Sequence, residues 1–209
     1  LSLTETRSTL LLYPVLLILY YLKSKTLSKV DFKKILLVII PIILITLSSH
    51  SATNRIIGIF SEVHSYDSGN NDTSIGARIS MWKAGINTIE QNPFGTSAYK
   101  RYQMNTAFIN KYEHGNPEAI ANLKYHLHND IIDSTSLQGI SGSIALMIFF
   151  GLLIFISAKY KQLSLLFFVA LPVITLGLTD TLFIDYRFAT TISILIAIHI
   201  LLQESNKDS

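Results

Sequence analysis

The residue types best suited to chemistry gather in one short stretch, His126-Leu127-His128-Asn129-Asp130. An imidazole titrates near neutral pH, so a histidine here suits the removal of a proton from a sugar hydroxyl. Two histidines separated by one residue do not share a helix face, so either one of them enters the site or the backbone is irregular. The structural alternative is that the histidines cap the entry to the apolar segment that follows. A zinc site is disfavoured, because no Glu-x-x-His pair and no third ligand is evident.

Two arginines are candidates for binding an anion. Arg7, in Thr4-Glu5-Thr6-Arg7, stands at the mouth of an apolar segment. Its guanidinium either faces a polar cavity suited to a phosphate or snorkels to the interface and pairs with Glu5. Arg78 falls in the first turn of a predicted helix, where a cation opposes the helix dipole. It is therefore either part of an anion site with the free backbone N–H groups there or a solvated side chain.

A short turn near the C-terminus concentrates three further charges, those of Asp180, Asp185 and Arg187. We favour the interpretation that these side chains form an anchoring ion pair at the membrane edge.

The distribution of charge predicts an all-α, polytopic integral membrane protein. The chain has 209 residues, with 17 basic and 14 acidic side chains and no cysteine, so no disulfide or thiolate chemistry is expected. Every charged residue falls outside five uncharged stretches, which are residues 8–22, 35–54, 134–158, 162–179 and 188–203. Such segregation argues against a soluble domain, disorder or a coiled coil. We expect about five transmembrane helices, and because the chain begins at Leu1 we expect it to be the C-terminal piece of a larger protein.

Lysine placement predicts the topology. Residues 23–34 contain five lysines and one acidic residue, and short lysine-rich loops stay on the cytoplasmic side. Residues 1–47 are then two spans joined by a basic cytoplasmic loop. Residues 48–139 form a large helical periplasmic loop domain that carries the site. Residues 140–209 supply three more spans and a short cytoplasmic tail.

Helical periodicity is visible within the outer loop. Apolar residues recur at helical spacing over residues 75–91, and the stripe consists of Ile75, Ile79, Trp82, Ile86 and Ile89. We expect this stripe to be the buried face of a helix that residues 72–74 cap and that Asn92-Pro93 ends. A second helix is predicted to begin at Asn116-Pro117, with four residues facing inward: Ala119, Ile120, Leu123 and Leu127. Residues 94–115 between them are predicted to be a loop.

Several segments, taken together in this order, resemble the enterobacterial O-antigen ligases (the WaaL family). The matching segments are Leu3-Thr4-Glu5-Thr6-Arg7-Ser8-Thr9-Leu10-Leu11-Leu12, Gly76-Ala77-Arg78, His126-Leu127-His128-Asn129, Ser136-Leu137-Gln138-Gly139 and Gly177-Leu178-Thr179-Asp180. The resemblance extends along the whole chain, which would correspond to roughly the C-terminal half of such a protein.

The resemblance implies a glycosyltransferase of the bacterial inner membrane with its active site on the periplasmic side. Such an enzyme moves O-antigen polysaccharide from undecaprenyl diphosphate to a lipid A–core sugar, with inversion and without a metal or nucleotide cofactor. Carried over by position, Arg7 and Arg78 would bind the diphosphate, and His128 would be the catalytic base. Supporting roles would fall to His126, Asn129, Arg101 and Asp180. Its partners would be these two lipid-linked substrates and membrane lipids, with no nucleic acid.

Two other functions stay open at this stage. An O-antigen polymerase of the same superfamily would differ in its acceptor, which we expect residues 94–115 to select. A scaffold or transporter that binds polyprenyl diphosphate without chemistry is the other alternative. A transporter usually shows buried charges at the membrane midplane, and the five stretches contain none. A scaffold would tolerate the loss of His128.

Overall fold

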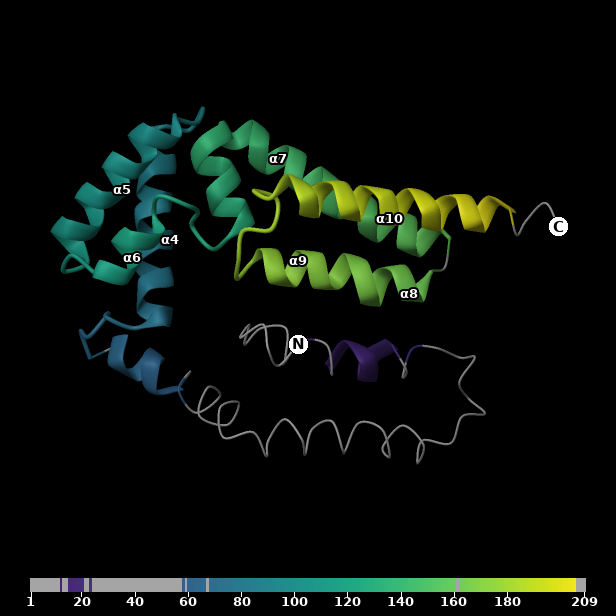
Figure 1. Cartoon of the computed structure of the whole chain (residues 1–209), viewed down its shortest axis with the longest axis horizontal. Coiled ribbons are helices and arrows are strands. Elements are labelled where there is room, and N and C mark those ends of the chain that lie inside the picture. Colours follow the sequence, from purple (N-terminus) through teal and green to yellow (C-terminus); the bar gives the residue numbers. More distant parts are fainter. Residues whose placement is uncertain are drawn as a thin grey trace.

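The computed structural model describes residues 12, 15–20, 23, 58, 60–66, 68–160 and 162–205, and these residues form helices and turns without any strand. The helices follow in the order α4 (Ser74–Gln91), α5 (Ala98–Tyr112), α6 (Pro117–Asn122), α7 (Asp130–Lys159), α8 (Leu163–Leu165), η3 (Leu166–Ala170), α9 (Leu171–Gly177) and α10 (Tyr186–Ser205). Figure 1 shows α4, α5 and α6 clustered at one end, while most of α7 runs beside α9 and α10. The all-α prediction holds for these residues. Arg7 and most of the first two predicted spans lie outside them.

Helix α4 has the predicted bounds but a different buried face. Thr73 caps it, because the Thr73 Oγ1 accepts from the N–H of Gly76 (3.0 Å), and it ends before Asn92. The buried residues are Gly76, Ala77, Ser80, Met81, Ala84, Gly85 and Thr88. The predicted isoleucine stripe is wrong: Ile86 is exposed, and the other members are only half-buried. Small residues face inward because α7 approaches closely, so that a Cβ at Gly85 would lie 2.6 Å from Ile132 Cγ2.

Helix α5 occupies most of the segment that the sequence predicts to be a loop. Ser97 caps it by accepting from the N–H of Lys100 (3.2 Å). Its buried residues, Arg101, Asn105 and Ile109, recur every four positions, but only one of them is apolar. Apolar periodicity therefore misses this helix, because its inner face is mostly polar.

Helix α6 begins as predicted after Asn116, whose side chain accepts from the N–H of Ala119 (2.9 Å). It is only six residues long, so Leu127 lies beyond its end. Leu127 is nevertheless fully buried in the core of this end of the molecule. That core consists of Ala77, Met81, Ala84, Ile109, Ala119, Leu123 and Leu127.

Helix α7 starts ten residues before the predicted span at Ile140 and bends at Gly139 (φ 73°, ψ −167°). The loop between α4 and α5 crosses the bend, where Thr96 N–H donates to the Leu137 carbonyl (3.2 Å) and Ile140 N–H to the Pro93 carbonyl (3.0 Å). These bonds satisfy backbone groups that the break in the helix leaves unpaired. The bend coincides with the predicted boundary between the outer loop and the last spans.

Within the described residues, one helix is long and apolar enough to cross a membrane. It is α7, with 30 residues and a mean hydropathy of 2.4 in its most apolar window. The apolar segments Leu163–Gly177 and Tyr186–Ile198 are shorter. They pack against α7 through a second core made of Phe150, Leu153, Ala170, Val173 and Ile192. The number of five spans stays a prediction.

Candidate active site

The two histidines lie in an irregular connection between α6 and α7. His128 has a left-handed backbone (φ 51°), so the expectation of an irregular backbone is confirmed. The imidazole rings of His126 and His128 meet edge to face, with centroids 4.2 Å apart. Trp82 of α4 holds this connection by donating its Nε1–H to the His128 carbonyl (3.2 Å). The structure therefore brings both histidines together at one site.

Asp180 faces His128 across the turn that follows α9. The His128 Nδ1 and the Asp180 Oδ1 are 3.0 Å apart, and the side chains are 18% and 41% exposed. Burial alone raises the pKa of Asp180, but hydrogen bonds from His128 and from the Thr181 N–H outweigh it, so this pKa is below its ordinary value. The carboxylate is then ionised at neutral pH and can only accept, which places the imidazole proton on Nδ1. The Nε2 lone pair of a neutral His128 is left available to a substrate.

His126 differs from its neighbour in its surroundings. Its pKa is lowered, chiefly by burial and next by the positive charge that His128 would carry. Its Nδ1 accepts from the backbone N–H of His128 (3.4 Å). His126 is therefore a neutral side chain at pH 7 that packs beside His128 and helps to fix its backbone.

The residues after His128 join its loop to the turn that carries Asp180. Asn129 donates its N–H to Thr181 Oγ1 (3.2 Å) and its amide to the Leu178 carbonyl (3.0 Å), while its Oδ1 caps α7. Asp130 accepts from the Phe183 N–H (3.1 Å). These three bonds bridge segments about 50 residues apart in the sequence and fix the distance between His128 and Asp180.

Arg101 lies buried behind the site, with only 4% of it exposed. Its Nη1 donates to Asp133 Oδ1 (2.7 Å) and to Ser136 Oγ (3.3 Å). The same Asp133 oxygen accepts from the Leu127 N–H (3.0 Å), between the two histidines. Arg101 therefore acts on the histidine loop through Asp133. The sequence pattern did not single out Asp133, whose only signal is a carboxylate at the start of an apolar helix.

Arg78 is half-buried, and its side chain makes no hydrogen bond or ion pair with another described residue. It precedes Trp82 by four residues on α4, and residues with that spacing share a helix face. Since Trp82 contacts His128, the Arg78 face of α4 is the one turned toward the histidine loop. The predicted ion pair in the last turn is confirmed for Asp185 and Arg187 (2.8 Å), but Asp180 pairs with His128 instead.

Three side chains could supply metal ligands. One atom each of His126, His128 and Asp180 lies within 4.8 Å of the others, so the expectation that no third ligand is nearby was wrong. Asp180 is distant from the two histidines in the sequence, so spacing along the chain does not identify it as a third ligand. Ligands of a tetrahedral zinc ion lie roughly 3.3 Å apart at bond lengths of about 2.0–2.1 Å. His128 and Asp180 already form a hydrogen-bonded pair, and the three side chains would have to move closer together to bind such an ion.

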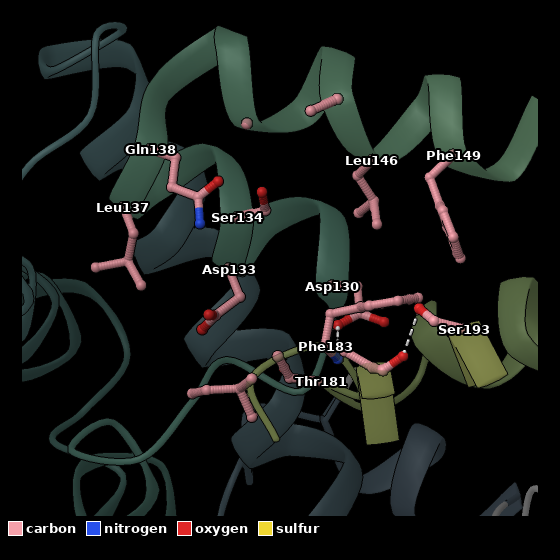
Figure 2. A pocket seen from close by; sticks show the side chains of 14 residues that line it. Asp130, Asp133, Ser134, Leu137, Gln138, Leu146, Phe149, Thr181, Phe183 and Ser193 are labelled. Carbon is pink, nitrogen blue, oxygen red and sulfur yellow. Dashed lines mark hydrogen bonds between the residues drawn. The ribbon is translucent and has the colours of Figure 1, made fainter. Parts of the chain in front are cut away.

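A cavity of about 410 Å³ adjoins the site between α7 and the start of α10. Figure 2 shows polar side chains along the first part of α7 and apolar ones beyond the bend. The polar lining includes Asp130, Asp133, Ser134 and Gln138, and the apolar lining includes Leu146, Phe149 and Phe183. None of its lining residues is basic. The cavity is therefore poorly suited to a diphosphate, which needs cationic partners.

Comparisons with known proteins agree with the motifs. A sequence model described as O-antigen ligase matches residues 1–147. The curated O-antigen ligase of Escherichia coli (strain K12) is 32% identical over 215 residues, which cover 100% of this chain and 50% of that protein. The chain thus spans about half the length of this relative. No solved structure matches. On this evidence the chain belongs to the O-antigen ligase family.

Proposed function

We propose that the protein containing this chain is a glycosyltransferase that joins O-antigen polysaccharide, carried on undecaprenyl diphosphate, to a sugar of lipid A–core. The reaction would take place at the periplasmic face of the bacterial inner membrane, and residues 48–139 would lie on the periplasmic side. The observation that carries the proposal is the hydrogen bond between His128 Nδ1 and Asp180, in a chain of this family.

This pair is suited to activating a hydroxyl. In the proposed step, His128 Nε2 takes the proton of an acceptor hydroxyl, and the oxygen attacks the anomeric carbon of the donor sugar. The bond between that carbon and the diphosphate oxygen breaks, and the diphosphate leaves from the opposite face, which inverts the carbon. Asp180 orients the ring and stabilises the imidazolium that forms. The proton then passes from His128 to water or to the departing diphosphate.

Arg78 is proposed to bind the diphosphate together with Arg7. An arginine that pairs with no described residue keeps its donors free for a ligand. Charge grows on the diphosphate as it leaves, and a guanidinium stabilises that charge more in the transition state than in the ground state. The sugar–diphosphate bond is already activated, so the step needs no nucleotide. A metal ion is not part of the proposed mechanism.

The test uses the full-length protein in a ligase-deficient Gram-negative host that makes both substrates. His128→Asn is compared with His114→Asn, because both histidines have a left-handed backbone that asparagine tolerates. The lipopolysaccharide ladder should be lost in His128→Asn and in Arg78→Ala, and kept in His114→Asn at equal membrane levels. A purified assay should keep its rate in EDTA.

Other outcomes would decide against parts of this proposal. A wild-type protein that restores no ladder but lengthens lipid-linked glycan would be a polymerase. Full activity of His128→Asn would remove the base assignment but leave the ligase function in place. A wild-type protein that restores no ladder and lengthens no glycan would favour a non-catalytic scaffold. Loss of activity in EDTA, with recovery on adding zinc, would show that the three clustered side chains bind a metal ion that the reaction needs.

A further inference from the structure

The loop between α4 and α5, residues 92–97, carries the most exposed large apolar side chain in the described part of the chain. Phe94 is 93% exposed. A phenylalanine ring in water is unfavourable, and an exposed apolar side chain that belongs to a larger apolar patch marks a site of contact with a protein or a membrane.

This exposure is built into the fold, because the loop is fixed on both sides of Phe94. The N–H of Gly95 donates to the Asn92 carbonyl (3.0 Å), and the two bonds to the bend of α7 hold Pro93 and Thr96. Gly95 (φ 89°) and Gly139 (φ 73°) face each other so closely that a Cβ at Gly139 would lie 2.4 Å from the Phe94 carbonyl carbon. The backbone of Phe94 therefore rests on α7, and its ring points away from the protein.

The place where Phe94 emerges is the start of an apolar face on α7. Immediately after Gly139, residues four apart expose their side chains in a row: Ile140 (51%), Ile144 (54%) and Ile148 (58%). Residues with this spacing lie on one side of a helix. Because α7 is the helix suited to crossing a membrane, this row is the face that lipid would cover. Phe94 lies next to the first residue of this row, because the Ile140 N–H donates to the carbonyl of Pro93, which precedes Phe94 (3.0 Å).

The beginning of α5 adds the composition typical of a membrane interface. Tyr99 is 72% exposed, and Lys100 is exposed with its Nζ bonded to Asn92 Oδ1 (3.0 Å). Aromatic residues are enriched at the level of the lipid headgroups, and lysine there is attracted to anionic lipids.

We propose that the Phe94 loop is an interfacial anchor whose partner is the outer leaflet of the bilayer. The ring would sit about 5–10 Å inside the boundary between headgroups and acyl chains. This inference depends on the proposed membrane placement of α7 and is independent of the ligase activity.

The anchor has a consequence for the site. The segment of α7 between Asn129 and Gly139 connects the histidine loop to the bend on which the anchor rests. An anchor at the bend therefore fixes the height of His128 above the bilayer, where a lipid-linked donor presents its diphosphate.

A nitroxide depth measurement tests the anchor. The full-length protein, with any other cysteines replaced, is labelled at Phe94→Cys and placed in phosphatidylethanolamine–phosphatidylglycerol vesicles. This chain itself contains no cysteine. Tyr112→Cys, at the other end of α5 and 57% exposed, is the aqueous control, and Ile148→Cys is the lipid control. Power saturation then compares collisions with oxygen, which dissolves in lipid, and with a water-soluble nickel chelate.

We expect the label at position 94 to favour oxygen over nickel, as at position 148, and the label at position 112 to show the reverse. Free access of nickel to position 94 would overturn the proposal. Shielding from both reagents would also overturn it, because it would mean that protein covers Phe94. If Phe94→Cys does not fold, Phe94→Trp replaces it. Quenching of the fluorescence of the new tryptophan by brominated lipid would then show whether position 94 lies in the bilayer. Absence of ligase activity from the wild-type protein, together with an oxygen-accessible label at position 94, would contradict the proposed function alone.

Discussion

At the scale of single residues, the site depends on which nitrogen of His128 carries the proton. The Asp180 carboxylate fixes that proton on Nδ1, since an ionised carboxylate accepts and cannot donate. His126, two residues away, has no carboxylate in hydrogen-bond contact and is therefore the weaker candidate for the base. The choice of His128 over His126, made from the family motif, now has a structural argument on its side.

Asp180→Asn tests this argument. An asparagine amide can donate to Nδ1 and would stabilise the wrong tautomer, so we expect the ligation rate to fall by roughly 10²- to 10⁴-fold at unchanged protein level. Asp185→Asn, in the same turn, is the control and should keep its rate, because within the described part of the chain the Asp185 carboxylate pairs with the exposed Arg187 and not with the histidines. Purified-enzyme kinetics with both lipid substrates give the rates. Equal rates for the two variants would remove Asp180 from the mechanism.

Arg101 is another single residue with a testable role, which is to stabilise the folded protein. Arg101→Met leaves Asp133 buried without its cation, and breaking a buried pair in this way costs about 3–5 kcal/mol of unfolding free energy. Lys111→Met, on the exposed side of the same helix, should leave the unfolding free energy nearly unchanged. Thermal unfolding in detergent measures both. An Arg101→Met protein as stable as the wild type would contradict this role of Arg101 in stability.

At the scale of elements, the helices of the outer segment are joined by polar contacts that meet at Glu113. Its carboxylate, directly after α5, accepts from Ser80 (2.9 Å) and Lys83 (2.9 Å) of α4 and from Tyr66 (3.3 Å). Burial raises the pKa of Glu113, but the hydrogen bonds from these partners outweigh burial and leave the pKa below its ordinary value. The charged form is thus favoured in the folded protein.

Because the pKa of Glu113 is lowered in the folded protein, the direction in which pH changes its contribution to stability is defined. The contribution of Glu113 is complete above the pKa of the unfolded chain and is lost as the pH falls through the folded value. We expect the wild-type melting temperature to fall as the pH drops below about 4.5. Glu113→Gln should melt lower at pH 7 and should depend less on pH in the acid range. A variant with the wild-type acid slope would show that other carboxylates cause it.

The helices also show how much of the fold could be predicted from the sequence. Caps and prolines predicted the bounds of α4 and the start of α6, because those signals are local. The buried face of α4 was not predictable from apolar spacing, since it consists mostly of small and polar residues, among them Gly85, which faces α7. Helix α5 was missed because Arg101 and Asn105 are buried by polar pairing that only the assembled fold supplies.

At the scale of the whole molecule, the contacts that make the site are the least predictable from sequence. His128 and Asp180 are 52 residues apart, and no spacing rule links them. The resemblance to O-antigen ligases named both, as well as Arg101, yet Asp133 and Trp82 gained their roles at the site only from the structure. Charge segregation, in contrast, is a property of the entire chain and predicts topology without any tertiary contact.

That topology can be tested directly. The positive-inside rule places the lysine-rich residues 23–34 in the cytoplasm and residues 48–139 outside the inner membrane. We expect a membrane-impermeant thiol reagent to label Tyr112→Cys in spheroplasts, and to label Ser28→Cys only after the membrane is permeabilised. Tyr112 is suitable because it is exposed and lies at the end of α5. Labelling of Ser28→Cys in intact spheroplasts would show that the topology is the reverse of the predicted one. His128 would then face the cytoplasm, away from an acceptor on the periplasmic side.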